Sequence, residues 1–220
     1  GAGAPMASSG RLRREPRHRR GSPDSGQTSD LPGEVRDTVY DNIQLPAVVM
    51  TYRIPAINTD DYYAVDMLNT LLSSGESSRM YKALVDEQQK AAFAGSFPFD
   101  LEDPGVALVF AIANAGVEPG SLEQAIDQEI EKVQSELISE REFLKLRNQI
   151  ENNVVKSNAN IEGKAENLAT YHVHYGNANL INTEIERYMQ VTREDIQRVA
   201  QEYFTKGNRV VLYYLPKPQP

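Results

Sequence analysis

LNTLLSSGESSRMYKALVDEQQKAAF, residues 68–93, contains a helix, a turn, a second helix and a strand in close succession. The first helical pattern ends at Leu72, where a run of small polar residues, Ser73–Ser78, begins. Small polar side chains compete with the backbone for hydrogen bonds and so end helices. A second helical pattern then runs to Gln88, with Met80 and Leu84 spaced for burial. This segment predicts two helices joined by a turn and followed by a strand.

The flanking sequence predicts further strands and helices. Alternating and β-branched patterns predict strands at residues 38–43, 47–54, 91–99, 106–113 and 209–215. Apolar residues at helical spacing predict helices at residues 60–72, 76–88 and 121–137, one long helical stretch over 139–175, and helices at 183–189 and 193–204. Hairpin-connected strands interleaved with helix pairs favour an α+β fold. We therefore expect a mainly antiparallel sheet that is covered on one face by helices.

Helix-end signals support these boundaries. Asn58-Thr59-Asp60 and Thr192 with Asp195 are typical of helix N-termini, and Gly176-Asn177 is expected to end the long helical stretch. Ser139 and Glu142 have the spacing of a capping box, in which each side chain bonds to the other's backbone N–H.

The N-terminus differs in composition from the rest of the chain. Residues 1–33 are rich in Gly, Ser, Pro and Arg and predict a flexible arm, linker or tag. Residues 34–217 are expected to form a single module, and residues 218–220 a tail. The first 30 residues hold six Arg and three acidic residues, a charge of +3, so the rest carries −11 for the total to be −8. An acidic body repels phosphate and argues against nucleic-acid binding.

Composition excludes cysteine-based sites and argues against a membrane span and a signal peptide, but it leaves the compartment open. The chain has no Cys, which excludes disulfides and thiolate metal ligands. No apolar run approaches about 18 residues, so no membrane span is expected. No apolar segment follows the N-terminal basic residues, as it would in a signal peptide. We expect a soluble protein, cytoplasmic or periplasmic, with the compartment left open.

No catalytic motif is present. The zinc signatures H-E-x-x-H and H-x-x-E-H are both absent. Besides His18, the chain contains His172 and His174, which point about 200° apart on a helix and are poorly placed for one metal. Acidic pairs such as Glu140 and Glu142 fit a solvated helix face. The polar run 73–78 fits either an anion cradle or a plain interhelical turn. We predict no catalytic residues and no metal ligands in this chain.

The segment Leu68–Phe93 resembles the C-terminal half-module of pitrilysin/insulinase-type zinc peptidases, in which a small-residue turn followed by Ser-Ser-Arg-Leu-Tyr-like residues joins two helices. The strand Pro46–Pro55 with helix Asp60–Leu72, and the ending from Val191 to the last strand, are also similar to that family. The resemblance implies homologous α+β modules in pairs, as in the mitochondrial processing peptidase. The first module would carry H-x-x-E-H and zinc, and the second, which this chain matches, would be non-catalytic.

The resemblance also identifies positions that contact substrate in active members. Those members often carry an Arg and a Tyr seven residues apart, where this chain has Asp86 and Phe93. Neither an acid nor a ring without a hydroxyl can donate the corresponding hydrogen bonds. The substrate-contact candidates are Arg79, which is the remaining Arg of the turn, Asp86 and Phe93. A structural or interface role is preferred for Arg79, and Phe93 is expected to be a core residue of its strand.

The resemblance implies a non-catalytic C-terminal module of a zinc endopeptidase that forms part of the substrate chamber and is inactive alone. Its expected partners are an H-x-x-E-H module, in the same natural chain or in a partner subunit, and a peptide substrate; a homo-oligomer is left open. Zinc is expected in that other module and no cofactor in this chain. The alternatives are an inactive scaffold or assembly subunit of the same fold and a tether that acts through the basic N-terminal arm.

Overall fold

A computed structural model describes residues 33–57, 59–99, 101 and 103–218 of the chain. The predicted N-terminal arm, Gly33 excepted, and the last two residues of the predicted tail lie outside the described residues.

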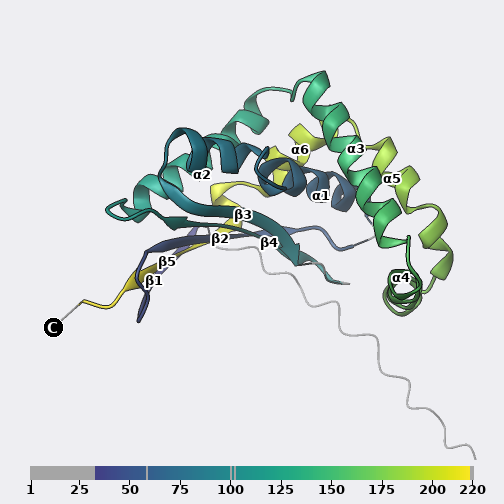
Figure 1. The fold of residues 1–220 in the computed structure, drawn as a ribbon, viewed down its shortest axis with the longest axis horizontal. Helices are drawn as coiled ribbons and strands as arrows, with labels where there is room; N and C mark the ends of the chain where they lie inside the picture. The colour runs from purple at the N-terminus through teal and green to yellow at the C-terminus, as the bar shows by residue number, and fades with distance from the viewer. Residues whose placement is uncertain (1–32, 58, 100, 102, 219–220) are drawn as a thin grey trace, which may run out of the picture. The chain divides into compact units, whose positions relative to one another are not determined.

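Five strands form one sheet in the order β1-β5-β2-β4-β3. β1 runs parallel to β5, whereas the other three neighbouring pairs are antiparallel, so the predicted mainly antiparallel sheet is confirmed. The strands, which lie together beneath the helices in Figure 1, are β1 (Val35–Asp41), β2 (Ala47–Ile54), β3 (Ala91–Phe99), β4 (Gly105–Ala113) and β5 (Arg209–Pro216).

The alternation of side chains along the strands separates two faces of the sheet. In β2, Val48 and Met50 are fully buried, whereas Val49 between them is half-buried and pairs across the sheet with Phe110 of β4. Successive side chains of a strand point to opposite faces. One face of the sheet therefore carries the core, and the other carries Val49 and Phe110.

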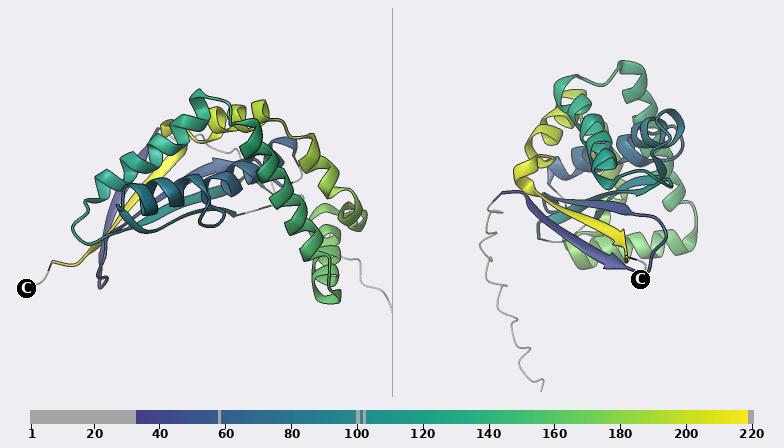
Figure 2. Two further views of the ribbon diagram at one scale, coloured as in Figure 1. Left: turned by 45° about the horizontal axis from the view of Figure 1, so that its top comes forward. Right: turned by 90° about the vertical axis from the view of Figure 1, so that its left-hand side faces the viewer.

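Helices cover only the core face, as predicted. α1 (Asp60–Ser73), α2 (Pro119–Ser135) and α6 (Arg193–Tyr203) pack on it, and Figures 1 and 2 show these helices on one side of the strands. The remaining helical segments are α3 (Glu140–Ser157), α4 (Ile161–Tyr175), α5 (Glu184–Gln190), a π-helix η1 (Tyr81–Glu87) and two 3₁₀ turns, η2 (Ala178–Asn182) and η3 (Lys206–Asn208).

The helix–turn–helix–strand segment at residues 68–93 forms the centre of the core. Met80 and Leu84 are fully buried, as their spacing predicted. The second helix differs from the prediction, because a turn occupies residues 74–78 and Tyr81–Glu87 has π-helical bonding. The Ser73 hydroxyl donates to the Ser96 carbonyl at 2.5 Å, which holds the end of α1 against β3.

The predicted helix-end signals are confirmed at three of four positions. Thr59 caps α1, and Thr192 and Asp195 form a complete capping box on α6. Gly176, in a left-handed conformation at φ +66°, ends α4 as predicted. The capping box at Ser139 is only half formed, because the Glu142 carboxylate binds Arg79 instead of the Ser139 backbone.

The single long helical stretch predicted over 139–175 is wrong. It breaks between Ser157 and Ile161 into α3 and α4. The Asn160 side chain accepts from the Gly163 N–H at 2.6 Å and starts a new helix, as Asn favours. A Cβ on Gly163 would lie 2.0 Å from the Ser157 carbonyl oxygen, so the close approach of the two segments requires glycine.

Candidate functional site

Arg79, the first of the three site candidates, is engaged within the helix layer. Its guanidinium binds the Glu142 carboxylate of α3 through two bonds, Nε–Oε1 at 2.9 Å and Nη2–Oε2 at 2.8 Å. This fork geometry is the strong form of an Arg–carboxylate pair. The bonds to Arg79 hold the pKa of Glu142 below its usual range. The contact fixes the Ser-rich turn to α3, and Glu142 is not the solvated carboxylate that the sequence predicted.

Asp86 and Phe93 lie apart from that pair. Asp86 is exposed near the end of η1. Phe93 lies in β3 and pairs with Ile112 of β4, but it is 49% exposed, so the expectation that it is a core residue is wrong. Because Ile112 and Phe93 belong to the face that carries no helix, Phe93 and Arg79 lie on opposite sides of the sheet. The structure does not bring the three candidates into one site.

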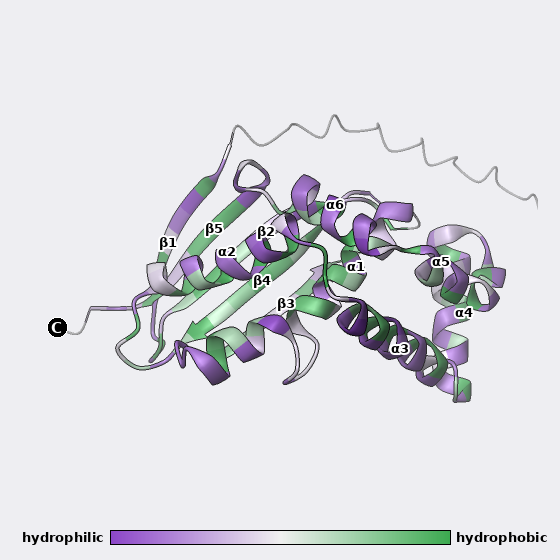
Figure 3. Cartoon of the chain, turned by 90° about the horizontal axis from the view of Figure 1, so that it is seen from above, coloured by the Kyte–Doolittle hydropathy of each residue, from purple (hydrophilic) through white to green (hydrophobic). Residues whose placement is uncertain are grey.

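Phe93 belongs instead to a broad apolar surface, which we term the open face. Its ring lies 5.5 Å from that of Phe110, and Phe97 lies 6.0 Å from Phe110 and 5.1 Å from Phe99. The strand register adds side chains from every strand, and Figure 3 shows hydrophobic residues along the length of the central strands. The open face comprises Val35, Val39, Val49, Phe93, Phe97, Phe99, Val106, Leu108, Phe110, Ile112, Val210 and Leu212.

A glycine shapes the aromatic end of the open face. A Cβ on Gly95 would lie 3.0 Å from Phe110 Cε1, so the Phe110 ring covers the backbone at that point. Phe97 and Phe99 are 41% and 48% exposed. Exposed aromatic side chains contribute large apolar area to binding. The spacing of Phe93, Phe97 and Phe99 at every second or fourth residue is the sequence signal for this surface.

The open face has the character of a binding surface. The strand register also places Asp37, Thr51, Arg53 and Tyr214 on this side of the sheet. No group of three or more His, Asp or Glu side chains in the described part of the chain is arranged to hold a metal ion. His172 and His174 are both exposed on α4. A contiguous exposed apolar patch of this kind marks an interaction surface.

The polar run at 73–78 lies between α1 and α3. Lys145 donates to the Ser77 hydroxyl at 2.5 Å, and Gln149 donates to the Ser74 hydroxyl at 2.6 Å. Ser78 is 5% exposed, and its hydroxyl has no partner among the described residues. These contacts from α3 support the interhelical-turn interpretation of the sequence.

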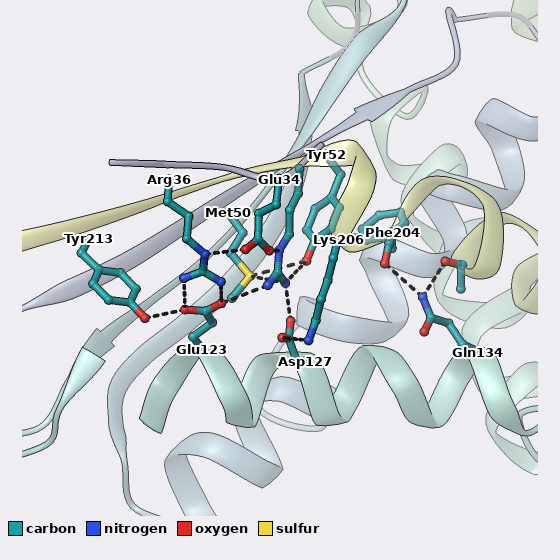
Figure 4. Close-up of polar contacts among 12 residues, drawn as sticks. Glu34, Arg36, Met50, Tyr52, Glu123, Asp127, Gln134, Phe204, Lys206 and Tyr213 are labelled. Atoms are coloured by element: carbon teal, nitrogen blue, oxygen red, sulfur yellow. Dashed lines mark hydrogen bonds and ion pairs between the residues drawn. The ribbon is translucent and has the colours of Figure 1, made fainter. Parts of the chain in front are cut away.

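A buried ionic network holds β1 and β5 against α2 (Figure 4). Arg209, whose side chain is 2% exposed, binds Glu34 at 2.6 Å, Glu123 at 2.9 Å and Asp127 at 2.5 Å. Arg36 of β1 also binds the Glu123 carboxylate. This network was not predicted from the sequence. The spacing of Glu123 and Asp127, one helical turn apart on α2, was the sequence pattern that could have indicated it.

The network shifts the pKa of its members. Burial alone would raise the pKa of Glu123, but hydrogen bonds from Arg36 and Tyr213 outweigh it and leave that pKa below its usual range. The bond from Arg36 likewise lowers the pKa of Glu34. Burial raises the pKa of Tyr52, which accepts from Arg209, to about 12. Glu34 and Glu123 are therefore ionised in the folded protein at neutral pH.

We expect the free energy of unfolding to fall as pH drops below about 5. A carboxylate whose pKa is one pH unit lower in the folded than in the unfolded chain contributes about 1.4 kcal/mol to this fall. Glu34, Glu123, Glu142 and Asp61 all have lowered pKa values in the folded chain, so the unfolded chain takes up protons first. Glu184, whose pKa burial raises, acts in the opposite sense. Urea unfolding from pH 3 to pH 7 measures this dependence, and the Glu142→Gln variant should show a shallower decline. Stability that is constant over this range would contradict it.

In the described ranges, no helix has both the length and the apolar character needed to cross a membrane.

Comparisons with known proteins identify relatives of this chain. The family model for the peptidase M16 inactive domain matches residues 10–150. The zinc protease PqqE of Helicobacter pylori is 28% identical over 176 residues, 80% of this chain and 39% of that protein. The solved inactive peptidase domain of a candidate zinc protease from Bordetella parapertussis is 25% identical, with a TM-score of 0.72, and the match covers 83% of this chain and 96% of that one.

A solved protease from Helicobacter pylori has the same fold, with a TM-score of 0.80 and 24% identity over 85% of this chain and 45% of that one. The α+β prediction is thereby confirmed. The chain spans 39% and 36% of the lengths of the two curated relatives that it matches.

Proposed function

This chain belongs to the peptidase M16 inactive-domain family, and on that premise we propose that it forms one wall of a peptidase chamber. It is a non-catalytic domain, homologous to the inactive halves of zinc proteases. In the proposal, an H-x-x-E-H module in the same natural chain or in a partner subunit supplies the chemistry. This chain encloses the peptide substrate and restricts which peptides fit.

The open face is the observation that carries this proposal. A soluble domain that works alone covers such a surface or keeps it small. Here the sheet leaves Phe93, Phe97 and Phe99 between 41% and 49% exposed. Extended peptides present apolar side chains and backbone hydrogen-bonding groups. An aromatic surface binds the apolar side chains and leaves the backbone groups free to form hydrogen bonds elsewhere.

The described residues of this chain do not fit zinc. His172 and His174 point about 200° apart on α4, and the described ranges hold no group of three or more His, Asp or Glu side chains that could hold a metal ion. A protein zinc site needs three or four converging ligands. In this proposal the metal is held by the H-x-x-E-H module, where it would activate the water that attacks the peptide bond.

The proposal predicts a loss of peptide hydrolysis when the open face becomes polar. In the assembled peptidase, Phe97→Ser should lower kcat/KM for an unstructured peptide by at least about tenfold, because an apolar contact with substrate or partner is lost. Leu137→Ser is the matched control, since Leu137 is also 41% exposed but follows α2 on the helix side of the sheet.

Two results would contradict the proposal. One is zinc-dependent hydrolysis by this chain in the absence of an H-x-x-E-H module. The other is an assembled Phe97→Ser peptidase with the same kcat/KM as the Leu137→Ser control.

The scaffold alternative has one observation in its favour. By the resemblance to pitrilysin/insulinase-type peptidases, Asp86 and Phe93 stand where active members often carry a hydrogen-bonding Arg and Tyr, and neither can donate the same bonds. As a scaffold, this chain would raise the stability of its partner without changing kcat/KM. Kinetics and thermal unfolding of the partner, with and without this chain, separate the two functions.

A further inference from the structure

α4 carries an apolar stripe that no other described residue covers. Ile161, Ala165, Leu168, Ala169 and Val173 recur at the spacing of one helix face, and all five are exposed. Glu162 and His172, which are also exposed, lie within the same arc of the helix. Ile161 is 88% exposed and Val173 is 69% exposed. We term the five apolar residues the α4 stripe.

α1, α2 and α6 bury most of their apolar residues, whereas α3 exposes Leu144 and Val155. In α6, Ile196, Val199 and Ala200 are fully buried. In α4 only Tyr171 is buried, and the helix packs mainly on η2. An amphipathic helix gains most of its stability from a covered apolar face. The α4 stripe therefore has the pattern of a core surface whose other half lies outside the described residues.

Specific contacts hold α4 in this position. Asn167, near the middle of α4, donates to the Asn158 side chain at 2.9 Å. Nearer the C-terminal end, the Tyr171 hydroxyl donates to the Glu184 carboxylate. The start of α4 is fixed by the Asn160 cap and by the close approach at Gly163. The helix is therefore presented in a set orientation.

α4 is also placed where a partner of the open face can reach it. Figures 1 and 2 show α4 beyond one end of the sheet, at the level of the strands and outside the layer that α1, α2 and α6 form. A body seated on the open face and extending past that end meets α4. The two uncovered apolar surfaces can thus be buried by one partner.

We propose that the α4 stripe docks on the H-x-x-E-H module and clasps it against this chain, an inference that rests on the proposed function. The length of the relatives supports this occupant, because this chain covers 45% of the solved Helicobacter pylori protease and leaves room for a second module of its own size. A second copy of this chain is a poorer partner. Two bodies that each carry −11 repel one another.

Amide hydrogen exchange tests this contact in the assembled peptidase. Amides of residues 161–175 should exchange at least about tenfold more slowly in the assembly than in this chain alone, because covered helices open less often. Leu168→Glu should remove that protection by placing a charge in an apolar interface. Thr170→Glu, an exposed position on the opposite side of α4, should keep it. Ile161→Glu, at a nearly fully exposed position, repeats the test if Leu168→Glu unfolds α4 in the isolated chain.

Each outcome decides the inference. Equal exchange in the assembly and the isolated chain, or equal behaviour of Leu168→Glu and Thr170→Glu, overturns it. Protection in the isolated chain that rises with its concentration would assign the stripe to a second copy and also overturn it. If the assembly hydrolyses peptide in a zinc-dependent way while the amides of α4 stay unprotected, the α4 inference is contradicted and the proposed function is retained. A protected α4 in an assembly that hydrolyses no peptide supports the clasp and contradicts the proposed function.

Discussion

Arg209→Met is expected to lower the free energy of unfolding of this chain by about 3–5 kcal/mol. The guanidinium is the shared cation of Glu34, Glu123 and Asp127, and its side chain is 2% exposed. Removing it leaves Glu123, whose side chain is 9% exposed, with less compensation for its buried charge. A buried charge that loses its partner costs far more than a surface ion pair is worth. Urea unfolding at pH 7 measures the change.

The Arg141→Met variant is the control for the loss of one positive charge. Arg141 is exposed on α3, and its replacement should change stability by less than about 0.5 kcal/mol. Adding Glu123→Gln to Arg209→Met should recover part of the loss, because it removes one of the uncompensated carboxylates. A loss below about 1 kcal/mol for Arg209→Met would mean that water or Arg36 already compensates the acids.

Leu72→Ala is expected to cost about 2–5 kcal/mol in the same measurement, because it leaves a cavity in a fully packed site. Leu72 is completely buried where α1 meets the turn of the 68–93 segment. Its counterpart is Phe97→Ala on the open face. That side chain is larger but 41% exposed, so its removal should cost the isolated chain less than Leu72→Ala.

In the assembled peptidase, Phe97→Ala should lower hydrolysis more than Leu72→Ala does, which is the reverse of the order expected for the stability of the isolated chain. Phe97→Ala should impair hydrolysis directly, whereas Leu72→Ala should act only through the fraction of chain that is folded. Peptide hydrolysis measured well below the unfolding temperature of each variant makes this comparison. Equal unfolding costs for the two variants in the isolated chain would show that the open face is packed as tightly as the core.

Much of the fold follows from local patterns. The strand Ala47–Ile54 and the strand Ala91–Phe99 were predicted with the bounds that the structure has. Alternation and turn residues specify a strand within a few residues of sequence. The burial of Met80 and Leu84 and the end of α4 at Gly176 were predicted on the same kind of local evidence.

The candidate site was predicted only in part. Phe93 was selected through the resemblance, and the structure adds Phe97, Phe99 and Phe110 beside it. Which face of a strand is left uncovered depends on where the helices pack, and a two-residue period is the same for both faces. The sequence therefore indicated aromatic strands without indicating that their rings gather on one exposed surface.

By itself the sequence determined the strands, the order of most helices and the absence of an H-x-x-E-H zinc motif, since these depend on residues close together in the chain. Tertiary structure alone decided the Arg209 network and the exposure of the α4 stripe. Arg209 and Glu123 are 86 residues apart and meet only because β5 packs beside α2. Helical periodicity in α4 marks a face that needs a partner, but only the packed fold shows that the described chain does not supply one.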